Sequence, residues 1–588
     1  MSAARLSSQA PQSVAIDPIT LEVIRSAFVA ATEEMGATLR RSAYSTNVKT
    51  RGDFSCCLFD RNLRVIAQSF TNPVHLGNMV HLVPNALRLY GLDRLRAGDM
   101  IVVNDPYLGS IHLNDVTVIA PVFHDGRLFG YLANLAHHVD VGGGAPASIG
   151  AFREIYQEGV QIPPVKLVEE GQIVEDTFRL ILAQIRSKRE TAGDFRAQVA
   201  ANITGARRLA ELLEAKGWET VTRTIDALVE STRKWTRAEI QTLPRGTFRD
   251  ECYLDSDGYS TDRVRLVAAV TVSDDGIEFD LTGSDPQRPA PVNASFGPIY
   301  SACAYALKAL TDPYLPVNQG FYDLVRVVAP PGTVVNAVHP APTVGGGEVQ
   351  IRLNDLLFKV FSQAMPEKVP AGCKAMQCHA GFGAVDLRSG EYYAFLETLA
   401  GGYGGRLELD GPDAVQSHGQ NTENAPVEET EASYPVRITR YELIPDSGGA
   451  GRRRGGLGLR RDYFFPNPTM FTVLADRELE GPWGLFGGRP GRKAEYILER
   501  DGLSQPLPSK ITVALRANET ISYRTCGGGG YGHPWEREPE LVAADVLDGK
   551  VTVERASSEY GVAIDGRDGE VDLQATGRLR FAMHPEST

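Results

Sequence analysis

The pattern of hydrophobic positions predicts an amphipathic helix near the start of the chain, ending at about Ser42. Asp17 is a favourable N-cap residue, and Pro18 suits the first helical position. The apolar residues that follow recur at helical spacing; they are Leu21, Ile24, Phe28, Met35 and Leu39. Residues 1–16 are expected to form a short mobile N-terminus.

The pattern then changes twice before the middle of the chain. Between residue 53 and about residue 141, short β-type runs at 101–103, 116–123 and 128–136 are separated by Gly, Asn and Pro. From 175 to about 243 the sequence is rich in Ala, Leu, Arg and Glu and almost free of Gly and Pro, which predicts one or more long helices.

The second half is predicted to be mainly sheet and loop. A β segment at 248–282 and an Ala-rich helix at 299–310 precede turn-rich sequence with repeated glycine clusters. After 535 the chain is polar, with short strands predicted near 551–553 and 571–573. The whole is a mixed α+β fold, with a helix-plus-sheet N-terminal half, long helices in the middle and a C-terminal half rich in strands and loops. It divides into residues 1–16, an α/β region (17–174), a helical region (175–243), a β-rich region (244–534) and a peripheral tail (535–588).

Composition and charge exclude several classes of protein. A chain of 588 residues is too long for one hydrophobic core, and 43% hydrophobic with 23% charged residues is typical of folded globular proteins. The net charge of −13 is spread along the chain, which argues against a nucleic-acid partner. The start lacks the apolar run of a secretory signal, no later run spans a membrane, and the seven cysteines are sparse, so we expect a cytoplasmic protein.

Two histidine clusters flank a predicted hairpin. Residues 124–127 (HDGR) carry the Asp-Gly pair of a two-residue turn, and strand-like runs lie on both sides. Counting outward from that turn places Asp115 opposite Ala136 and His112 opposite Val139. Imidazole and carboxylate groups therefore gather at one end of the hairpin, where they suit a zinc, manganese or iron ion.

Strand alternation alone does not bring all of these groups to one face. It places His112 with His137 on one side of the sheet and Asp115 with His138 on the other, so a bulge or loop at 111–114 is needed to turn one of them. The alternative is that these are ordinary polar residues at a sheet edge.

Three further clusters carry weaker hypotheses. Cys373, Cys378 and His379 lack the spacing of a zinc motif and suit buried thiols. The glycines at 526–532 lack the Lys-Ser/Thr ending of a phosphate loop and favour a flexible turn. The arginine-rich stretch at 448–461 is equally consistent with gripping an anion and with an interface or solvated loop.

Several separated motifs resemble the hydantoinase B/oxoprolinase family, over roughly residues 17–535. They occur in one order, and their combination is far more specific than any single motif; they are RGDFS (51–55), NDPY (104–107) with HLND (112–115), AHH (136–138), NTENAPVE (421–428), YP (434–435), DSGGAG (446–451) with RGG (454–456), and the glycines at 527–532. The runs GGGEVQ (345–350) and GGYGGR (401–406) depart from the family's pattern and leave the substrate open.

The resemblance implies a divalent metal site made by Asp53, His112, Asp115 and His137, with His112, Asp115 and His137 also acting in catalysis. Asp105, His138 and Asp140 would be neighbours that support these ligands. Zinc is the expected ion, with manganese and iron as alternatives. The resemblance also implies a partner subunit of actin-like fold, similar to hydantoinase A, which binds ATP, in an assembly of two copies of each subunit.

The implied activity is ATP-dependent hydrolysis of a cyclic amide such as a hydantoin, 5-oxoproline or another lactam. Acetone and acetophenone carboxylases also resemble this family, so a subunit of an ATP-dependent ketone carboxylase is the second hypothesis. The third is a non-catalytic scaffold for the ATPase subunit, which would have no reason to keep the metal.

Overall fold

A computed structural model of the chain describes residues 16–565 and 569–583. The predicted first helix is confirmed as α1 (Pro18–Ser42), and the Asp17 carboxylate caps it by accepting hydrogen bonds from the backbone N–H groups of Ile19 and Thr20. The predicted mobile segment lies outside the described residues, except for Ile16.

The first half of the chain forms a seven-stranded antiparallel sheet, in the order β2-β1-β5-β4-β3-β6-β7. Its strands are β1 (Phe54–Asp60), β2 (Val65–Gln68), β3 (Met100–Val103), β4 (Asp115–His124), β5 (Arg127–His137), β6 (Val165–Glu169) and β7 (Gln172–Ile173). Successive side chains of a strand face opposite ways. In β1, Leu58 accordingly packs into the core beneath α1, whereas Phe59 packs into a second core on the other side of the sheet.

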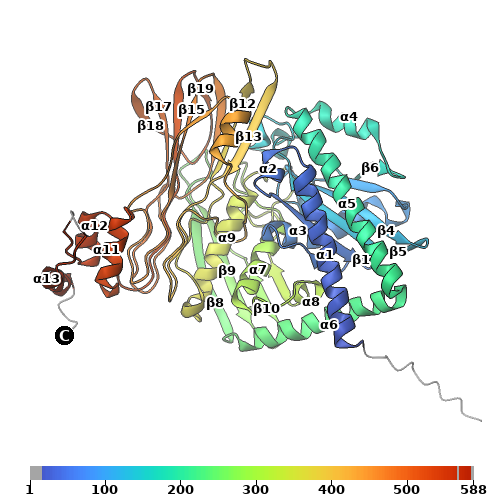
Figure 1. Ribbon diagram of the computed structural model, residues 1–588, viewed down its shortest axis with the longest axis horizontal. Coiled ribbons are helices and arrows are strands. Elements are labelled where there is room, and N and C mark those ends of the chain that lie inside the picture. Colours follow the sequence, from blue (N-terminus) through green and yellow to red (C-terminus); the bar gives the residue numbers. More distant parts are fainter. Residues whose placement is uncertain (1–15, 566–568, 584–588) are drawn as a thin grey trace, which may run out of the picture.

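The long helices predicted in the middle of the chain are confirmed, and α1 and α5 lie together across one face of the sheet (Figure 1). The helices of the middle region are α4 (Glu175–Ala183), α5 (Lys188–Lys216) and α6 (Trp218–Thr242). Two helices lie in or beside the region predicted as strands, the short α2 (Thr46–Lys49) and the longer α3 (Pro73–Tyr90). The prediction missed α3, which covers the opposite face of the sheet from α1.

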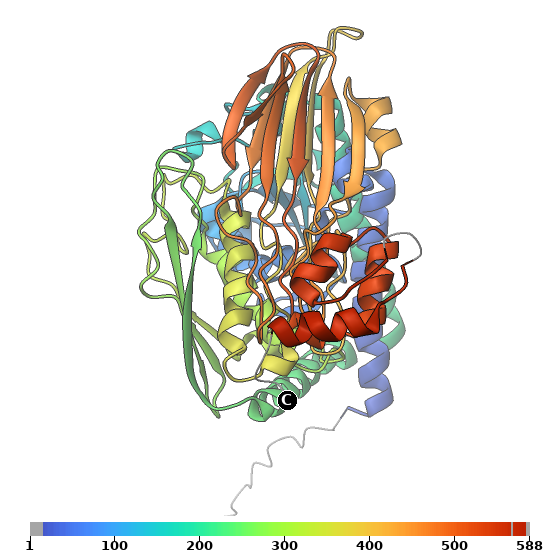
Figure 2. The same cartoon turned by 90° about the vertical axis from the view of Figure 1, so that its left-hand side faces the viewer.

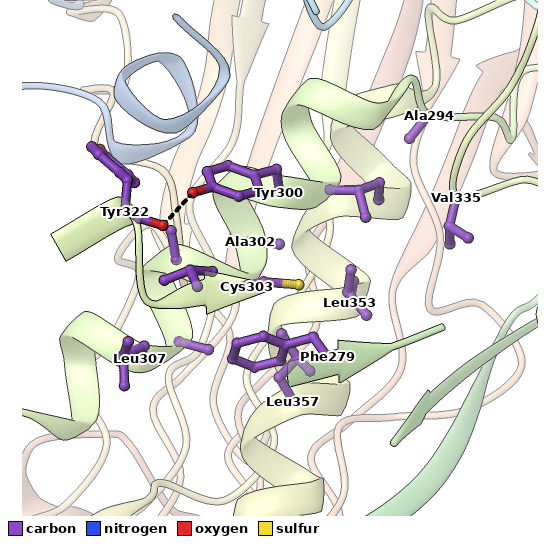
Figure 3. Close-up of a cluster of buried hydrophobic side chains, with 14 of the residues drawn as sticks. Phe279, Ala294, Tyr300, Ala302, Cys303, Leu307, Tyr322, Val335, Leu353 and Leu357 are labelled. Atoms are coloured by element: carbon purple, nitrogen blue, oxygen red, sulfur yellow. Dashed lines mark hydrogen bonds between the residues drawn. The ribbon is translucent and has the colours of Figure 1, made fainter. Parts of the chain in front are cut away.

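A second layer follows, with a four-stranded sheet in the order β11-β10-β9-β8. Its elements are β8 (Gly246–Leu254), β9 (Val264–Val272), β10 (Ile277–Asp280), α7 (Phe296–Leu310), α8 (Gln319–Tyr322), β11 (Val325–Val328) and α9 (Gly346–Phe361). Figure 3 shows how Phe279, Cys303 and Leu357 from β10, α7 and α9 meet in the core of this layer. The hydroxyl of Tyr300 donates a hydrogen bond to the carbonyl of Tyr322 over 3.0 Å, which ties α7 to α8.

The rest of the β-rich half forms two neighbouring sheets, at the top of Figure 2. Their orders are β13-β12-β16-β19 and β14-β15-β20-β17-β18. The elements are β12 (His379–Val385), β13 (Tyr392–Thr398), α10 (Val427–Ser433), β14 (Arg437–Leu443), β15 (Leu459–Phe465), β16 (Thr469–Leu474), β17 (Glu495–Arg500), β18 (Leu503–Pro506), β19 (Lys510–Leu515) and β20 (Glu519–Arg524). Aromatic side chains fill the space between the sheets, among them Phe382, stacked on Phe395 with ring centroids 4.7 Å apart.

The glycine-rich segment at 526–532 is buried, so the expectation of a flexible turn is wrong. Backbone hydrogen bonds join it to surrounding segments, for example from Gly528 N–H to the Gly456 carbonyl (2.9 Å) and from Gly405 N–H to the Gly529 carbonyl (2.8 Å). A Cβ atom at Gly528 would lie 2.0 Å from the Tyr403 carbonyl oxygen. Glycine is therefore required because the backbones pack against each other directly.

The C-terminal tail is helical, and the strands predicted near 551–553 and 571–573 are wrong. It forms α11 (Pro539–Leu547), α12 (Val553–Tyr560) and α13 (Leu573–Met583) at the edge of the molecule (Figure 1). Arg537 fastens the tail to the body, since its guanidinium contacts Asp410 and Asp545, each over 2.7 Å.

The mixed α+β class predicted from the sequence is confirmed by this arrangement. Single-turn 3₁₀ helices in the described residues lie at Leu92–Arg94, Pro106–Leu108, Pro146–Ser148, Ile155–Gln157, Pro366–Lys368 and Pro534–Glu536. None of the helices within residues 16–565 and 569–583 has the combined length and apolar character needed to cross a bilayer.

Candidate metal centre

The four predicted metal ligands line one small cavity of about 30 Å³. Asp53 directly precedes β1, His112 lies in the loop before β4, Asp115 opens β4 and His137 ends β5. All four side chains are buried. The cavity is close to the size that one water molecule or ion needs.

A β-bulge decides which groups of the hairpin face the cavity. The predicted turn is confirmed, with positive φ at Asp125 (49°) and Gly126 (72°). The counted register is wrong by one residue, because a shift between Val122 and Phe123 places Asp115 opposite His137. Residues directly opposite each other share a face of the sheet, so the bulge brings Asp115 and His137 to one face, and the turn predicted at 111–114 is confirmed as what brings His112 to the same face.

The loop before β4 brings His112 to the same place. The backbone carbonyl of His112 accepts a hydrogen bond from the Asp115 N–H at a distance of 3.1 Å, which holds the loop in a turn. One potential ligand atom from each of His112, Asp115 and His137 lies within 4.8 Å of the others. The His112 Nδ1 atom is 3.8 Å from Asp115 Oδ2, and the rings of His112 and His137 meet edge to face at 4.9 Å.

Two further histidines line the cavity, and the sequence pattern did not predict either of them there. His75, in the first turn of α3, has its Nε2 atom 3.6 Å from Asp53 Oδ1 and 3.7 Å from Asp115 Oδ1. His379, at the start of β12, has its Nδ1 atom 3.8 Å from Glu348 Oε1. His75 was missed together with α3, and His379 had been grouped with two cysteines.

Polar side chains hold the cavity's walls in position. Arg51 donates to Asn47 Oδ1 over 3.0 Å, and the Asn47 amide nitrogen lies 3.2 Å from His137 Nδ1. Arg51 also donates to the Thr398 hydroxyl over 2.7 Å, which connects β13 to the same network. On the other side, the Asn72 amide donates to Asp53 Oδ1 over 3.2 Å.

Burial dominates the electrostatics of the site. It lowers the pKa of His112 well below its usual value and that of His137 to about 4, so both rings are neutral and able to offer a lone pair. Burial, and then the charge of Asp53, raise the pKa of Asp115 well above its usual value. For Asp53, burial raises the pKa, but His137, His75, Arg51 and the hydrogen bond from Asn72 together outweigh it, so the pKa is lowered.

The residues present fit a divalent metal ion. Both carboxylate oxygens of Asp115 and the Nδ1 atom of His112 are buried without a hydrogen-bond partner among the described residues. Such atoms are costly unless something binds them. A mixed set of imidazole nitrogens and carboxylate oxygens suits zinc, manganese or iron.

The three residues expected to support the ligands have partners elsewhere. His138 points away from the cavity residues to Gln198 on α5, with 2.9 Å between Nε2 and Oε1. Asp140 pairs with Arg186 over 3.0 Å, and Asp105 caps a 3₁₀ turn by accepting from the Tyr107 N–H. None of the three lines the cavity.

The neighbouring histidines provide a direct test of the site. His137→Ala is expected to lower the bound metal at least tenfold, because it removes a group that lines the cavity, whereas His138→Ala should keep the metal and lose only packing and one hydrogen bond. Elemental analysis of the two purified variants measures this. Equal metal content in both would show that His137 is not a ligand.

The other clusters of the sequence have internal partners. Cys373 lies with Asp355 and His418, with one potential ligand atom of each within 4.8 Å, but the Asp355 carboxylate already accepts from Arg477 (2.7 Å) and Trp483 (2.9 Å). The arginines at 452–461 also contact the protein itself: Arg454 pairs with Asp413 and Arg461 with Glu397. For these arginines internal pairing replaces the anion-binding hypothesis.

Comparisons with known proteins agree with this fold. A putative D-/L-hydantoinase subunit of Pseudomonas sp. (strain NS671) is 34% identical over 96% of this chain and 98% of its own length. The crystal structure of the ATP-dependent caprolactamase of Pseudomonas jessenii has a TM-score of 0.89 and 32% identity, over 96% of this chain and 99% of the other. An acetone carboxylase structure has a TM-score of 0.90 over 97% of this chain and 83% of the other, but only 20% identity, so it shows a shared fold.

The family model described as hydantoinase B/oxoprolinase matches residues 17–534. This range covers most of the chain and includes every residue of the candidate metal centre. The resemblance drawn from the separated motifs is confirmed, and with it the expectation of an enzyme of this type. The chain belongs to the hydantoinase B/oxoprolinase family.

Proposed function

We propose that this chain is the metal-binding subunit of an enzyme that hydrolyses a cyclic amide at the expense of ATP. The observation that carries the proposal is the buried cavity, in which the Asp115 oxygens and His112 Nδ1 have no hydrogen-bond partner within the described part of the chain. The relatives named as a hydantoinase subunit and a caprolactamase support the substrate class, at 34% and 32% identity. In the proposal, a partner subunit of actin-like fold binds ATP and activates the amide.

Asp53, His112, Asp115 and His137 would hold the ion. A bound divalent ion polarises a carbonyl and lowers the pKa of a water molecule, which is the chemistry that attack on an activated amide needs. Asp53 and Asp115 would supply the negative charge that compensates the ion, with the ion displacing the proton that burial favours on Asp115, and the neutral rings of His112 and His137 would supply lone pairs.

The size of the cavity limits what enters it. At about 30 Å³ it has no room for a lactam ring beside an ion. In the proposal, only the reacting carbonyl or the attacking water reaches the ligands, and the ring lies outside the cavity. Thr398, Gln377 and Gln420 line the same cavity and offer hydrogen bonds to the polar atoms of a substrate held there.

Glu348 and His379 are the groups that the proposal assigns to proton transfer beside the ligands. Burial raises the pKa of Glu348 to about 7, so its carboxylate exchanges a proton near neutral pH. The Glu348 Oε1 atom has no hydrogen-bond partner in residues 16–565 and 569–583 and lies 3.8 Å from His379 Nδ1, and His379 lines the cavity. In the proposal, Glu348 takes the proton of the attacking water through His379 and returns it to the leaving nitrogen; burial lowers the pKa of His379 to about 3, so the ring passes the proton on and does not keep it.

The two other hypotheses differ in what they require of the site. A ketone carboxylase would use the same ligands, and the acetone carboxylase likeness supports the shared fold but carries less identity than the amide hydrolases do. A scaffold without chemistry has no use for buried atoms that lack partners among the described residues, which disfavours it.

An assay of the chain together with its ATPase partner tests the proposal. We expect ATP-dependent ring opening of at least one substrate among hydantoins, 5-oxoproline and larger lactams, and no turnover by either subunit alone. The same mixture with small ketones and bicarbonate is the comparison. Turnover of ketones alone would replace the hydrolase by the carboxylase, and a metal-loaded complex inactive on both classes would favour the scaffold.

A further inference from the structure

A second cavity, of about 590 Å³, lies where α1, the start of α3, α7 and residues 313–322 meet. Most of its lining is apolar, with Ile66, Leu76 and Phe321 among the side chains that form it. It shares no lining residue with the metal centre. Its volume falls within the range of about 300–1,000 Å³ that is typical of small-molecule sites.

One stripe of α7 forms a wall of this cavity. Ser301, Ala304, Tyr305 and Lys308 line it at positions i, i+3, i+4 and i+7, so they lie on one side of the helix. Other positions of α7, such as Cys303, point into the core (Figure 3). The small side chains of Ser301 and Ala304 leave the space that the cavity occupies.

Lys308 ends this stripe, and its ammonium group bonds to backbone oxygens. Its Nζ atom donates to the carbonyl oxygens of Asp312 (2.7 Å) and Pro313 (3.1 Å), and an ammonium group has a third N–H to offer. Across residues 16–565 and 569–583 no carboxylate lies within ion-pair distance of Lys308, and the acidic groups whose charge acts on it are Asp312 and Glu239. Arg25 lines the same cavity, and its guanidinium contacts Glu22 through Nε and one terminal nitrogen.

Two aromatic side chains at the cavity are unusually exposed. Phe70 is 81% and Tyr314 85% accessible to solvent, and both belong to the lining. Large exposed aromatic groups gathered at a hollow mark surfaces that bind something apolar. The cavity therefore combines an apolar interior, a half-buried ammonium group and an aromatic rim.

We propose that this cavity binds a small carboxylic acid with an apolar body. The carboxylate accepts the third N–H of Lys308, and the hydrocarbon part lies between α3 and α7, covered by Phe70 and Tyr314. A carboxylate suits the site because the Lys308 ammonium group has an N–H left to donate and forms no ion pair within the described part of the chain, and charge-assisted hydrogen bonds are the strong ones. The proposal does not depend on the reaction assigned to the metal centre.

The first turn of α3 separates the two cavities, because Pro73 lines this cavity whereas Val74 and His75 line the metal centre. A carboxylate probe must therefore be shown not to bind the metal. The His112→Ala variant, titrated without metal, removes that alternative and is expected to bind the probe as tightly as the wild type.

The experiment is calorimetric titration of the full chain with octanoate, octanol and octylamine. Octanoate should bind at least tenfold more tightly than octylamine. Lys308→Met should weaken octanoate at least tenfold and leave octanol unchanged, and Ala304→Trp, which fills the cavity, should weaken both. Equal affinity for octanoate and octylamine, or octanoate binding unchanged in both variants, would overturn the proposal, and thermal melting of each variant shows that it is folded.

Discussion

Replacing His112 with alanine is expected to remove both the bound metal and the activity. The wild-type chain should purify with close to one divalent ion, and the variant with almost none, because the ring offers a buried nitrogen that has no hydrogen-bond partner in the part of the chain that the structure describes. Turnover with the ATPase partner should fall at least a thousandfold, since the polarisation supplied by such an ion is worth several kcal/mol. Elemental analysis and the ATP-dependent assay of the same preparations measure both effects.

His418→Ala is the matched control for this variant. His418 is also buried, and burial lowers its pKa to about 4, but its ring packs against Phe358 at a tilt and does not line the metal cavity. It should keep the metal even where it loses stability. Full metal content in His112→Ala would remove His112 from the site, and activity that survives complete loss of metal would refute the metal mechanism.

The sequence predicted the elements whose pattern contrasts buried with exposed positions. The helix at Pro18–Ser42 and the long helices between residues 175 and 242 each bury one face and expose the other, so their periodicity is legible. Helix α9 gives no such contrast, because nearly all of its residues are buried, including Glu348 and Arg352. The residues that pack around α9 come from other parts of the fold, so no periodic pattern within its own sequence predicts the helix.

The sequence predicted which four residues line the candidate site, but it did not predict how they are arranged. The Asp-Gly turn brought the two histidine clusters together correctly, whereas the register failed by one residue at Val122 and Phe123. A bulge leaves no mark in an apolar strand, because both registers bury similar side chains. His75 and His379 reach the cavity from α3 and β12, and only the tertiary packing of those elements places them there.

The role of the glycine clusters could also not be predicted from the sequence. Glycine is the residue of flexible turns, which led to that expectation for residues 526–532. Here the absence of side chains serves close contact between backbones, as at Gly402, where a Cβ atom would lie 2.1 Å from the Gly528 nitrogen. One chain cannot distinguish these two uses, because the partner segments lie more than a hundred residues apart.

The effect of Asp115→Asn on thermal stability is expected to have opposite signs in the metal-free and the metal-loaded protein. Asp115 is fully buried, and neither of its carboxylate oxygens has a hydrogen-bond partner among the described residues. Without metal, burial and the charge of Asp53 disfavour the ionised form of Asp115, and the amide carries no charge at any pH, so the variant should melt at least as high as the wild type at neutral pH. With metal at a thousandfold excess over Kd, the wild type gains about 4 kcal/mol of stability, and the variant should gain little.

Thermal melting of both proteins, with and without added zinc or manganese, shows which of the two is more stable in each condition. Asp140→Asn is the control: Asp140 is also buried, but its carboxylate is paired with Arg186 over 3.0 Å. Removing that charge leaves Arg186 without its ion-pair partner, so this variant should melt lower than the wild type in both conditions and still respond to metal. An Asp115→Asn variant that melts lower without metal, or that is stabilised by metal as much as the wild type, would show that Asp115 is a structural residue.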